Sequence, residues 1–465
     1  GFKNADGSDA PDDWKMSRAG LRADWKFGNG ADASVISEIY DGTTRPGLTI
    51  FNDVSDEIDL IFPSKDQRGG HIIGNYQSIP NDDGSFYKFK GYYDRYENYD
   101  YRINEKRDVV DLEFRQHMQP WDHHYFIWGA SYRLTHYSFS NARNIVPQAN
   151  GRTDHLYNAF IQDDIALDTN LNLTLGSRFE HNPFTGFEIQ PSARLAWKPK
   201  PQRTIWTAVS RAVKTPSLSE TRVDTYGITL ASNNSLLLNI LGNETLKSEE
   251  ITAFEFGFRE QIHDSVRLDI AAFANRYQNI LTYAGTTDEC TYGSRDPNPP
   301  YLCEISGTGI TEAPAELINE MKAWSYGFEF TLDWNVNEWW SLHANYSAMR
   351  LDADSIESST PKANEWLIEN LSANNTANLR SSMNLPNDWQ LDLWVRYIDN
   401  LRDQEIPAHT GFDVRIGKTV GDNFELSLTG QNLFKKQRLE FNEIFSGLQE
   451  SEIEQAWYFQ LRLNY

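Results

Sequence analysis

The sequence predicts an all-β fold, a transmembrane antiparallel β-barrel of which about nineteen strands are present. Three observations predict it. Apolar and polar side chains alternate with a period of two, the alternating segments are long, and the connections between them alternate between short and long. No run of residues approaches the roughly eighteen consecutive apolar side chains that a membrane-spanning helix needs. Any crossing of a bilayer by this chain therefore has to use strands.

The alternation is clearest in segments of ten residues or more, which is longer than the roughly five or six residues typical of strands in soluble sheets. In residues 325–334 an aromatic or aliphatic side chain stands at every second position, and residues 254–258 repeat the pattern. Strands of this length suit a tilted crossing of a bilayer. At the C-terminus the apolar face consists of Trp457, Phe459, Leu461, Leu463 and Tyr465.

The connections predict which end of the barrel faces outward. Short turns rich in Gly, Pro, Asn and Asp, such as residues 28–30 and 386–388, join every second pair of strands. An outer-membrane barrel has short periplasmic turns and long outer loops. The strands are expected to begin near residues 15, 31, 69, 85, 106, 121, 154, 170, 188, 202, 249, 264, 321, 338, 372, 387, 409, 423 and 456. The long connections, expected to be polar and irregular, are 42–68, 138–153, 212–248, 285–320, 352–371 and 435–455.

A closed barrel is the only sheet that can span a bilayer, because every backbone polar group inside the hydrocarbon must be paired within the protein. The alternative is a soluble all-β array such as a propeller or solenoid. Such arrays show a fixed sequence repeat, which this chain lacks, and its apolar face carries bulky aromatic side chains. The sequence favours the barrel.

Charge and composition narrow the function. The net charge of −23 argues against binding of nucleic acid, whose phosphates require a basic surface. Two interpretations of the acidity stay open: an ordinary solvated surface, or loops and a lumen that attract cationic ligands. Hydrophobic residues are only 39% of the chain while aromatic residues reach 13%, so composition alone does not separate a soluble protein from a barrel.

The only two cysteines, Cys290 and Cys303, lie close together in one polar, Pro- and Gly-rich loop. This proximity predicts a disulfide and an oxidising compartment such as the periplasm or the cell surface. Closing so short a loop stabilises the fold by roughly 3 kcal/mol in the chain-entropy model. The spacing does not match a zinc site, and no metal site is predicted.

Four segments resemble the TonB-dependent receptor family. Residues 210–217, SRAVKTPS, resemble the family's S-R-A-x-R-x-P block, with Lys214 where Arg is common. Residues 243–249, NETLKSE, followed by residues 255–259, EFGFR, are similar to its N-x-x-L-K-x-E segment and the strand entered after it. Residues 428–434, LTGQNLF, resemble the family's penultimate strand, and 461–465 resemble the aromatic-ended terminal strand read by the barrel assembly machinery. In this order and spacing the four segments together indicate the family.

The resemblance implies a barrel of twenty-two strands preceded by a globular plug and a short box that engages TonB. Counting back from Tyr465 leaves three strands unaccounted for, and nothing in residues 1–30 resembles the plug or the box. We therefore expect residues 1–465 to be an N-terminally truncated receptor barrel. The resemblance also implies a multi-pass protein of the Gram-negative outer membrane, with outer-membrane lipid, TonB and the barrel assembly machinery as partners.

The function implied by the resemblance is TonB-coupled active uptake of a scarce ligand: a ferric siderophore, cobalamin or haem, with carbohydrate also open. The resemblance implies neither a resident cofactor nor a catalytic activity, and no catalytic or phosphate-binding motif stands out in the sequence. Two rivals remain, a passive porin without a plug and a surface adhesin or enzyme built on a β scaffold.

Candidate ligand contacts lie in the two longest loops of the second half, where exposed aromatic rings could stack on a ligand. These are Tyr226, Tyr283, Tyr292 and Tyr301. The polar face of the strands predicts a charged lumen that is wet or packs against a plug, formed by Glu255, Arg259, Glu329, Asp333, Asp392 and Arg396.

Smaller features leave alternatives open. Gly257, Gly327 and Gly430 either make room for a plug on the lumen side or are ordinary twist and bulge positions. His117, His123 and His124 flank a predicted turn with an aromatic residue between them. They would form either a metal or haem site or, as their periplasmic position favours, a polar turn beside an interfacial aromatic belt.

Overall fold

The wall of the molecule is one antiparallel sheet of nineteen long strands. The structure is a computed structural model, and it describes residues 13–52, 57–230, 233–285, 294–295, 303–305, 310–355, 362–402, 405–421, 423–441 and 451–463. In order round the wall these strands are β1 (Trp14–Lys26), β2 (Asp32–Thr44), β5 (Lys65–Gln77), β6 (Phe86–Tyr99), β7 (Asn104–Trp121), β8 (His124–Ser140), β10 (Gly151–Asp168), β11 (Leu171–Asn182), β12 (Gly186–Lys200), β13 (Arg203–Lys214), β16 (Glu249–His263), β17 (Val266–Gly285), β20 (Ile310–Asn337), β21 (Trp340–Ser355), β22 (Asn375–Leu385), β23 (Trp389–Ile398), β24 (His409–Val420), β25 (Phe424–Gln431) and β28 (Ala456–Leu463).

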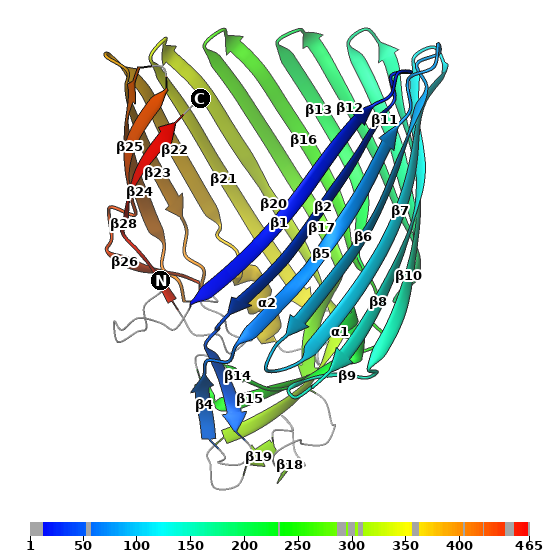
Figure 1. Cartoon of the computed structure of the whole chain (residues 1–465), viewed down its shortest axis with the longest axis vertical. Coiled ribbons are helices and arrows are strands. Elements are labelled where there is room, and N and C mark those ends of the chain that lie inside the picture. The colour runs from blue at the N-terminus through cyan, green and yellow to red at the C-terminus, as the bar shows by residue number, and fades with distance from the viewer. Residues whose placement is uncertain are drawn as a thin grey trace.

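This architecture confirms the predicted fold class and its strands. Every predicted strand is present and begins within a few residues of its expected position, with one exception. The exception is β20, which begins at Ile310 because its first part continues to pair with loop strands beyond the wall. The strands are strongly tilted, with tight turns at one end and the long loops at the other (Figure 1). By the rule of short periplasmic turns, the loop end faces outward.

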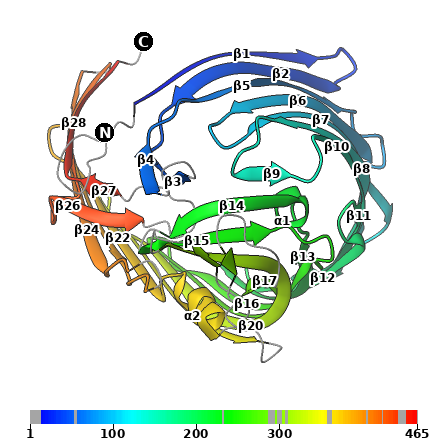
Figure 2. The same ribbon diagram turned by 90° about the horizontal axis from the view of Figure 1, so that it is seen from below.

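The sheet curls round a central space and has β1 and β28 as its edges (Figure 2). Among the residues that the structure describes, no pairing joins β1 to β28. Neither described helix is long and apolar enough to cross a bilayer.

The long connections contain regular structure, so the prediction that they are irregular was wrong. Their described parts hold two short helices and nine strands, and the strands form because these segments pair with one another or with the extended ends of wall strands. The elements are β3 (Leu48–Asn52), β4 (Glu57–Ile61), β9 (Ile145–Pro147), α1 (Leu218–Arg222), β14 (Val223–Leu230), β15 (Asn233–Leu241), β18 (Ser294–Arg295), β19 (Cys303–Ile305), α2 (Lys362–Asn370), β26 (Gln437–Phe441) and β27 (Ser451–Glu454).

Three of these strands and the first part of β20 form a small sheet across the mouth, which we call the mouth sheet. β14 pairs antiparallel with β9 and β15, and β15 pairs in parallel with residues 311–316 of β20. Figure 2 shows β14 and β15 crossing the interior between β9 and β20. α1 leads into this sheet and begins with a capping box, in which Ser217 Oγ accepts from Glu220 N and the Glu220 carboxylate accepts from Ser217 N.

The two faces of the wall differ in chemistry as the alternation predicts. Large apolar side chains are exposed on the outer face, for example Leu21 at 70% and Ile39 at 64%. The C-terminal strand follows the same rule: Trp457, Phe459, Leu461 and Leu463 are all more than half exposed, and Tyr465 lies outside the described residues. Such an outer surface is stable in lipid and would aggregate in water.

The three singled-out glycines have different roles. A Cβ at Gly257 would collide with the indole of Trp206 on the neighbouring strand, and one at Gly327 would lie 2.8 Å from the ring of Phe273. Each therefore makes room for an aromatic ring of the wall itself, on the inner face. Gly430 pairs with the exposed Trp457 and lies on the lipid-facing side, so of the two alternatives the lumen position is excluded for this glycine.

Candidate functional site

A row of inward-facing aromatic and basic side chains crosses five neighbouring strands in the outer half of the lumen. The register pairs Tyr40 on β2 with Gly69, Gly69 with Tyr96, Tyr96 with Arg107, and Arg107 with Tyr137 on β8. Direct cross-strand partners on one face lie about 4.5–5.5 Å apart at Cβ. Three tyrosines and one arginine are therefore aligned at a single level, and we call them the tyrosine–arginine row.

Gly69 is necessary to this arrangement. A Cβ at this position would lie 2.7 Å from the hydroxyl oxygen of Tyr40 and close to the backbone of Arg95. Because position 69 has no side chain, the ring of Tyr40 can lie over β5, the strand that separates β2 from Tyr96 on β6. A side chain there would separate the first tyrosine of the row from the rest.

Arg107 is the charged residue of the row and has no ionic partner within the part of the chain that the structure describes. Its guanidinium lies 5.2 Å from the ring centre of Tyr96, which is cation–π distance. Its Nε atom is buried and makes no hydrogen bond, and among the described residues no carboxylate forms an ion pair with it. By contrast Arg152, which follows Tyr137 in the same register, pairs with Asp154. A buried N–H without a partner costs about 1–3 kcal/mol, which an oxygen anion placed against Arg107 would recover.

A pocket of about 490 Å³ lies beside the row on the same wall. Arg133 donates from Nε to Asp111 Oδ2 at 2.8 Å and lies 5.8 Å from the ring centre of Tyr92. Lys90 approaches the same ring at 5.8 Å and has no ion pair among the described residues. Tyr92 is thus held between two cations. The pocket is lined by His71, Ile73, Lys90, Tyr92, Asp94, Arg107, Val109, Arg133, Thr135 and Tyr137.

The row and the pocket present aromatic faces and unpaired positive charge together. Such a surface suits a ligand that has both an anionic oxygen donor set and a flat face, because arginine binds oxyanions and tyrosine stacks. These residues were not predicted from the sequence, because they lie in strands of the first half and the predicted ligand contacts lie in loops of the second half. In residues 92–99, aromatic side chains occur on both faces of the strand, so alternation does not tell inside from outside there.

The predicted ligand tyrosines lie in the mouth region where the structure describes them. Tyr226 is on β14, where its N–H donates to Asn144 O at 2.8 Å. Tyr283 is at the outer end of β17, opposite Leu317. Burial raises the pKa of the Tyr283 hydroxyl, and the charge of Glu220 adds to this while Lys214 opposes it, so the phenol stays neutral at physiological pH. Tyr292 and Tyr301 lie outside the described residues, and ligand contact by the four tyrosines stays a prediction.

The predicted disulfide cannot be followed, because Cys290 lies outside the described residues. Cys303 opens β19, where it pairs through the backbone with Arg295 and Glu312.

The predicted charged residues of the lumen share the inner face of the second half of the wall. Four of them form ion pairs within it: Arg259 with Asp269, Asp333 with His343 at 2.6 Å, Asp392 with Arg415 at 3.2 Å and Arg396 with Asp413 at 2.7 Å. The carboxylates of Glu255 and Glu329 have no hydrogen bond or ion pair among the described residues. Packing of this face against a plug stays a prediction.

The three histidines are built into the turn end of the wall. His117 stacks on Phe86 with ring centres 4.4 Å apart, and its Nδ1 lies 3.1 Å from the Tyr125 hydroxyl. His124 pairs with Asp163 at 2.8 Å, while His123 takes a positive φ of 68° in the turn. Within the described part of the chain, no group of His, Cys, Asp and Glu side chains has the arrangement of a metal site. The contacts support the interpretation of these residues as a polar turn beside an aromatic belt.

Comparison with known families gives one match that covers most of the chain. Residues 3–433 match the family model described as TonB dependent receptor-like, beta-barrel. Among curated proteins, the iron-regulated outer membrane virulence protein of Vibrio cholerae is 26% identical over 188 residues, which is 40% of this chain and 26% of that protein. The ferric enterobactin receptor of Pseudomonas aeruginosa is 27% identical over 129 residues, 27% of this chain and 17% of that protein. The chain thus matches about a quarter or less of the length of these relatives.

Two solved structures illustrate the likeness in fold. The siderophore receptor PirA from Acinetobacter baumannii superposes with a TM-score of 0.73 and 15% identity, covering 97% of this chain and 71% of that one. The ferripyoverdine receptor of the outer membrane of Pseudomonas aeruginosa, bound to ferripyoverdine, gives 0.65 and 12% identity over 97% of this chain and 65% of that one. At such identities the likeness concerns the fold alone.

Proposed function

Because the chain belongs to the TonB-dependent receptor family, whose barrel model matches residues 3–433, we propose that it forms the barrel of an outer-membrane receptor that imports a ferric siderophore by TonB-coupled active transport. Its similarity to named siderophore and iron receptors supports iron over cobalamin and haem as the cargo class. The matched family and these relatives are receptors and transporters rather than enzymes.

The tyrosine–arginine row is the observation that carries the ligand part of the proposal. Iron chelators bind the metal through hard oxygen donors, and many ferric complexes are consequently anionic. Arg107 offers such a complex an unpaired guanidinium, and Tyr40, Tyr96 and Tyr137 offer aromatic faces at the same level. A ligand passing down this wall would next meet the pocket beside Lys90 and Arg133.

The passive porin is the rival that needs a direct test. The mouth sheet supports the receptor, because β14 and β15 lie across the interior that a passive pore would keep open. The contact with TonB is inferred from the family alone.

The test is radioiron uptake by cells in which the protein is the only iron–chelate receptor. We expect uptake of an anionic ferric chelate to require both TonB and an energised inner membrane. Uptake that persists after deletion of TonB would support the porin and overturn the proposal. Hydrolysis of the chelate by the purified protein would support the enzyme rival.

A further inference from the structure

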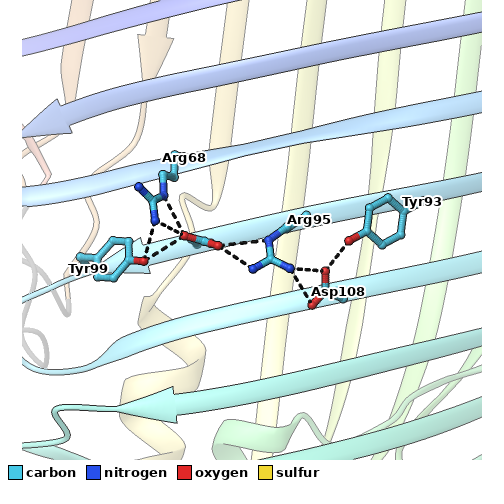
Figure 3. Close-up of polar contacts among 6 residues, drawn as sticks. Arg68, Tyr93, Arg95, Tyr99 and Asp108 are labelled. Carbon is cyan, nitrogen blue, oxygen red and sulfur yellow. Dashed lines mark hydrogen bonds and ion pairs between the residues drawn. The ribbon is translucent and has the colours of Figure 1, made fainter.

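A dense polar network lies on the outer face of the wall, on the side that meets lipid. It joins Arg68 on β5, Arg95 and Glu97 on β6, and Asp108 on β7 (Figure 3). The register places these four on the same face as Ile72 and Val110, which are 49% and 37% exposed. The network lies on the loop side of those apolar residues, which is the level of the outer-leaflet headgroups.

The surface of this network is cationic although its charges nearly balance. Glu97 accepts from Arg68 Nε at 2.7 Å, from Arg95 Nη2 at 2.7 Å and from the Tyr99 hydroxyl at 2.9 Å. Its side chain is only 9% exposed, whereas those of Arg68 and Arg95 are 57% and 46% exposed. The carboxylate is thus covered by the two guanidiniums that it orients, and these face outward.

A further cation extends the patch. Lys106 on β7 is the register partner of Glu97, is exposed, and forms no ion pair among the described residues. The Tyr93 hydroxyl, on the side of the patch nearer the middle of the bilayer, donates a hydrogen bond to the Asp108 carboxylate at 2.5 Å. That carboxylate is therefore already hydrogen-bonded. Two exposed carboxylates lie beside the patch: Asp41, the register partner of Arg68 on β2, and Asp66 on β5, which accepts from the Thr43 hydroxyl. Three exposed cations therefore stand against two exposed anions.

An apolar groove of about 550 Å³ runs beneath the patch toward the middle of the bilayer. Its floor is Gly70, where a Cβ would lie 2.8 Å from the carbonyl oxygen of Glu38 and 2.9 Å from the Cγ2 methyl of Ile39. Its walls include Ile39, Ile72 and Tyr93. The groove thus joins a hydrocarbon-lined channel to a cationic rim.

We propose that this groove binds one phosphate-bearing lipid of the outer leaflet. An acyl chain lies over Gly70 between Ile39 and Ile72, and the headgroup phosphate contacts Arg68 and Lys106. The apolar groove lies deeper in the bilayer than the cationic patch. This arrangement matches the acyl chain and the headgroup of a lipid, and it does not match a water-soluble ligand. Basic pockets on a membrane protein at headgroup level recognise anionic headgroups in this way, and arginine suits phosphate. The site is independent of the proposed transport ligand.

The experiment measures lipid binding to the purified protein in detergent micelles by native mass spectrometry. The probes are lipid A that carries its phosphates and the same lipid after dephosphorylation. We expect one tightly bound phosphorylated lipid and much weaker binding of the dephosphorylated form. The variant R68Q/K106Q should weaken binding of the phosphorylated lipid about thirtyfold, and K106Q alone about fivefold.

The matched control is R203Q, which removes an outward-facing arginine at the turn end of the wall, where it pairs with Glu260. R203Q should leave binding unchanged. Equal binding of the two lipid forms would overturn the proposal, as would equal affinity in R68Q/K106Q and R203Q. If the double variant fails to assemble, K106Q decides the question, because Lys106 holds no ion pair in the described structure: unchanged binding in K106Q would overturn the site.

Discussion

The inner faces of two opposite walls differ in how their charges are used. One wall is formed by β5–β8 and the other by β16–β24, and they face each other across the lumen (Figure 2). On the second wall, Arg259 and Arg396 are each matched by an aspartate on a neighbouring strand. On the first wall, Arg107 and Lys90 have aromatic neighbours but no ion pair among the described residues.

The two walls also differ in which charges lie beside aromatic rings. On the first wall the cations of Lys90 and Arg107 do so, with the carboxylate of Asp94 lining the same pocket, whereas the second wall leaves the carboxylates of Glu255 and Glu329 without an ion pair among the described residues. A paired charge on a strand stabilises its neighbours and offers little to a ligand, since its partner would have to be replaced. An unpaired charge costs stability in the empty protein and favours an opposite charge. This difference supports the proposed ligand contact on the first wall, whereas the ion pairs of the second wall stabilise its own strands.

Arg107→Gln should have the largest effect on transport. Loss of a hydrogen bond to a charged group costs about 1.5–3 kcal/mol, so uptake of an anionic ferric chelate should fall about ten- to a hundredfold at subsaturating concentration. Radioiron uptake by cells with equal amounts of assembled protein measures this. Arg259→Gln, which removes a paired arginine of the second wall, is the control and should change uptake less than threefold. Similar losses in both variants would contradict the distinction between the walls.

Gly257→Val should affect assembly rather than binding. The added side chain would collide with Trp206, whose ring lies 4.5 Å from the Arg194 guanidinium. Overpacking of this kind costs about 1–3 kcal/mol. We expect a lower urea midpoint for the folded band in unheated SDS gels, with unchanged affinity in the fraction that folds. Gly74→Ala is the control, because the nearest atom to its Cβ would be 3.9 Å away. A normal midpoint for Gly257→Val would refute this packing role.

Asp111→Asn should strengthen ligand binding at the first wall, because it removes the ion-pair partner of Arg133 and leaves a second cation unpaired there. Arg133 would lose its ionic partner at 2.8 Å and become available to the pocket. Affinity for an anionic chelate should rise about threefold, as expected for a partly exposed charge worth about 0.7 kcal/mol. The rise should be absent in Asp111→Asn/Arg133→Gln. Weaker binding in the single variant would show that the ion pair, and not the free charge, shapes the pocket.

Asp100, in the outer connection between β6 and β7, gives the smallest effect and a pH dependence. Burial raises the pKa of this carboxyl, but hydrogen bonds and charge from Arg102, with charge from Lys65, more than offset it and leave the pKa below its usual range. A depressed pKa stabilises the fold above the unfolded value of about 3.9 and stops doing so as the pH falls through the folded value. Asp100→Asn should thus lower the urea midpoint slightly at pH 7 and not at about pH 2. A difference that grows on acidification would contradict this assignment.

The sequence predicted the wall well because its signal is local. Period-two alternation and turn chemistry located every wall strand, and they placed Phe254 and Phe256 on the lipid side and Glu255 between them. Prediction failed where pairing is not local. The parallel pairing of β15 with β20 joins residues 75 positions apart, such as Leu236 and Thr311, and no pattern within either segment indicates it.

The site could be predicted only in part for a related reason. The tyrosine–arginine row depends on the register of five strands, since a shift by one residue at β6 would turn Tyr96 toward lipid. The lack of an ionic partner for Arg107 is likewise a property of its neighbours in space. The sequence alone shows an arginine among many charged residues, and only the assembled wall shows that this one lies in a row of tyrosines and has no ion pair among the described residues.

The most direct test of the account is an affinity comparison between two ferric chelates of different charge. Titrations followed by tryptophan fluorescence would compare a strongly anionic ferric tris-catecholate with a neutral ferric tris-hydroxamate on the unaltered protein and on Arg107→Gln. If Arg107 is the anchor for ligand charge, the substitution weakens the anionic chelate at least tenfold more than the neutral one. Equal weakening of both chelates would show that Arg107 does not read ligand charge, and would contradict the account.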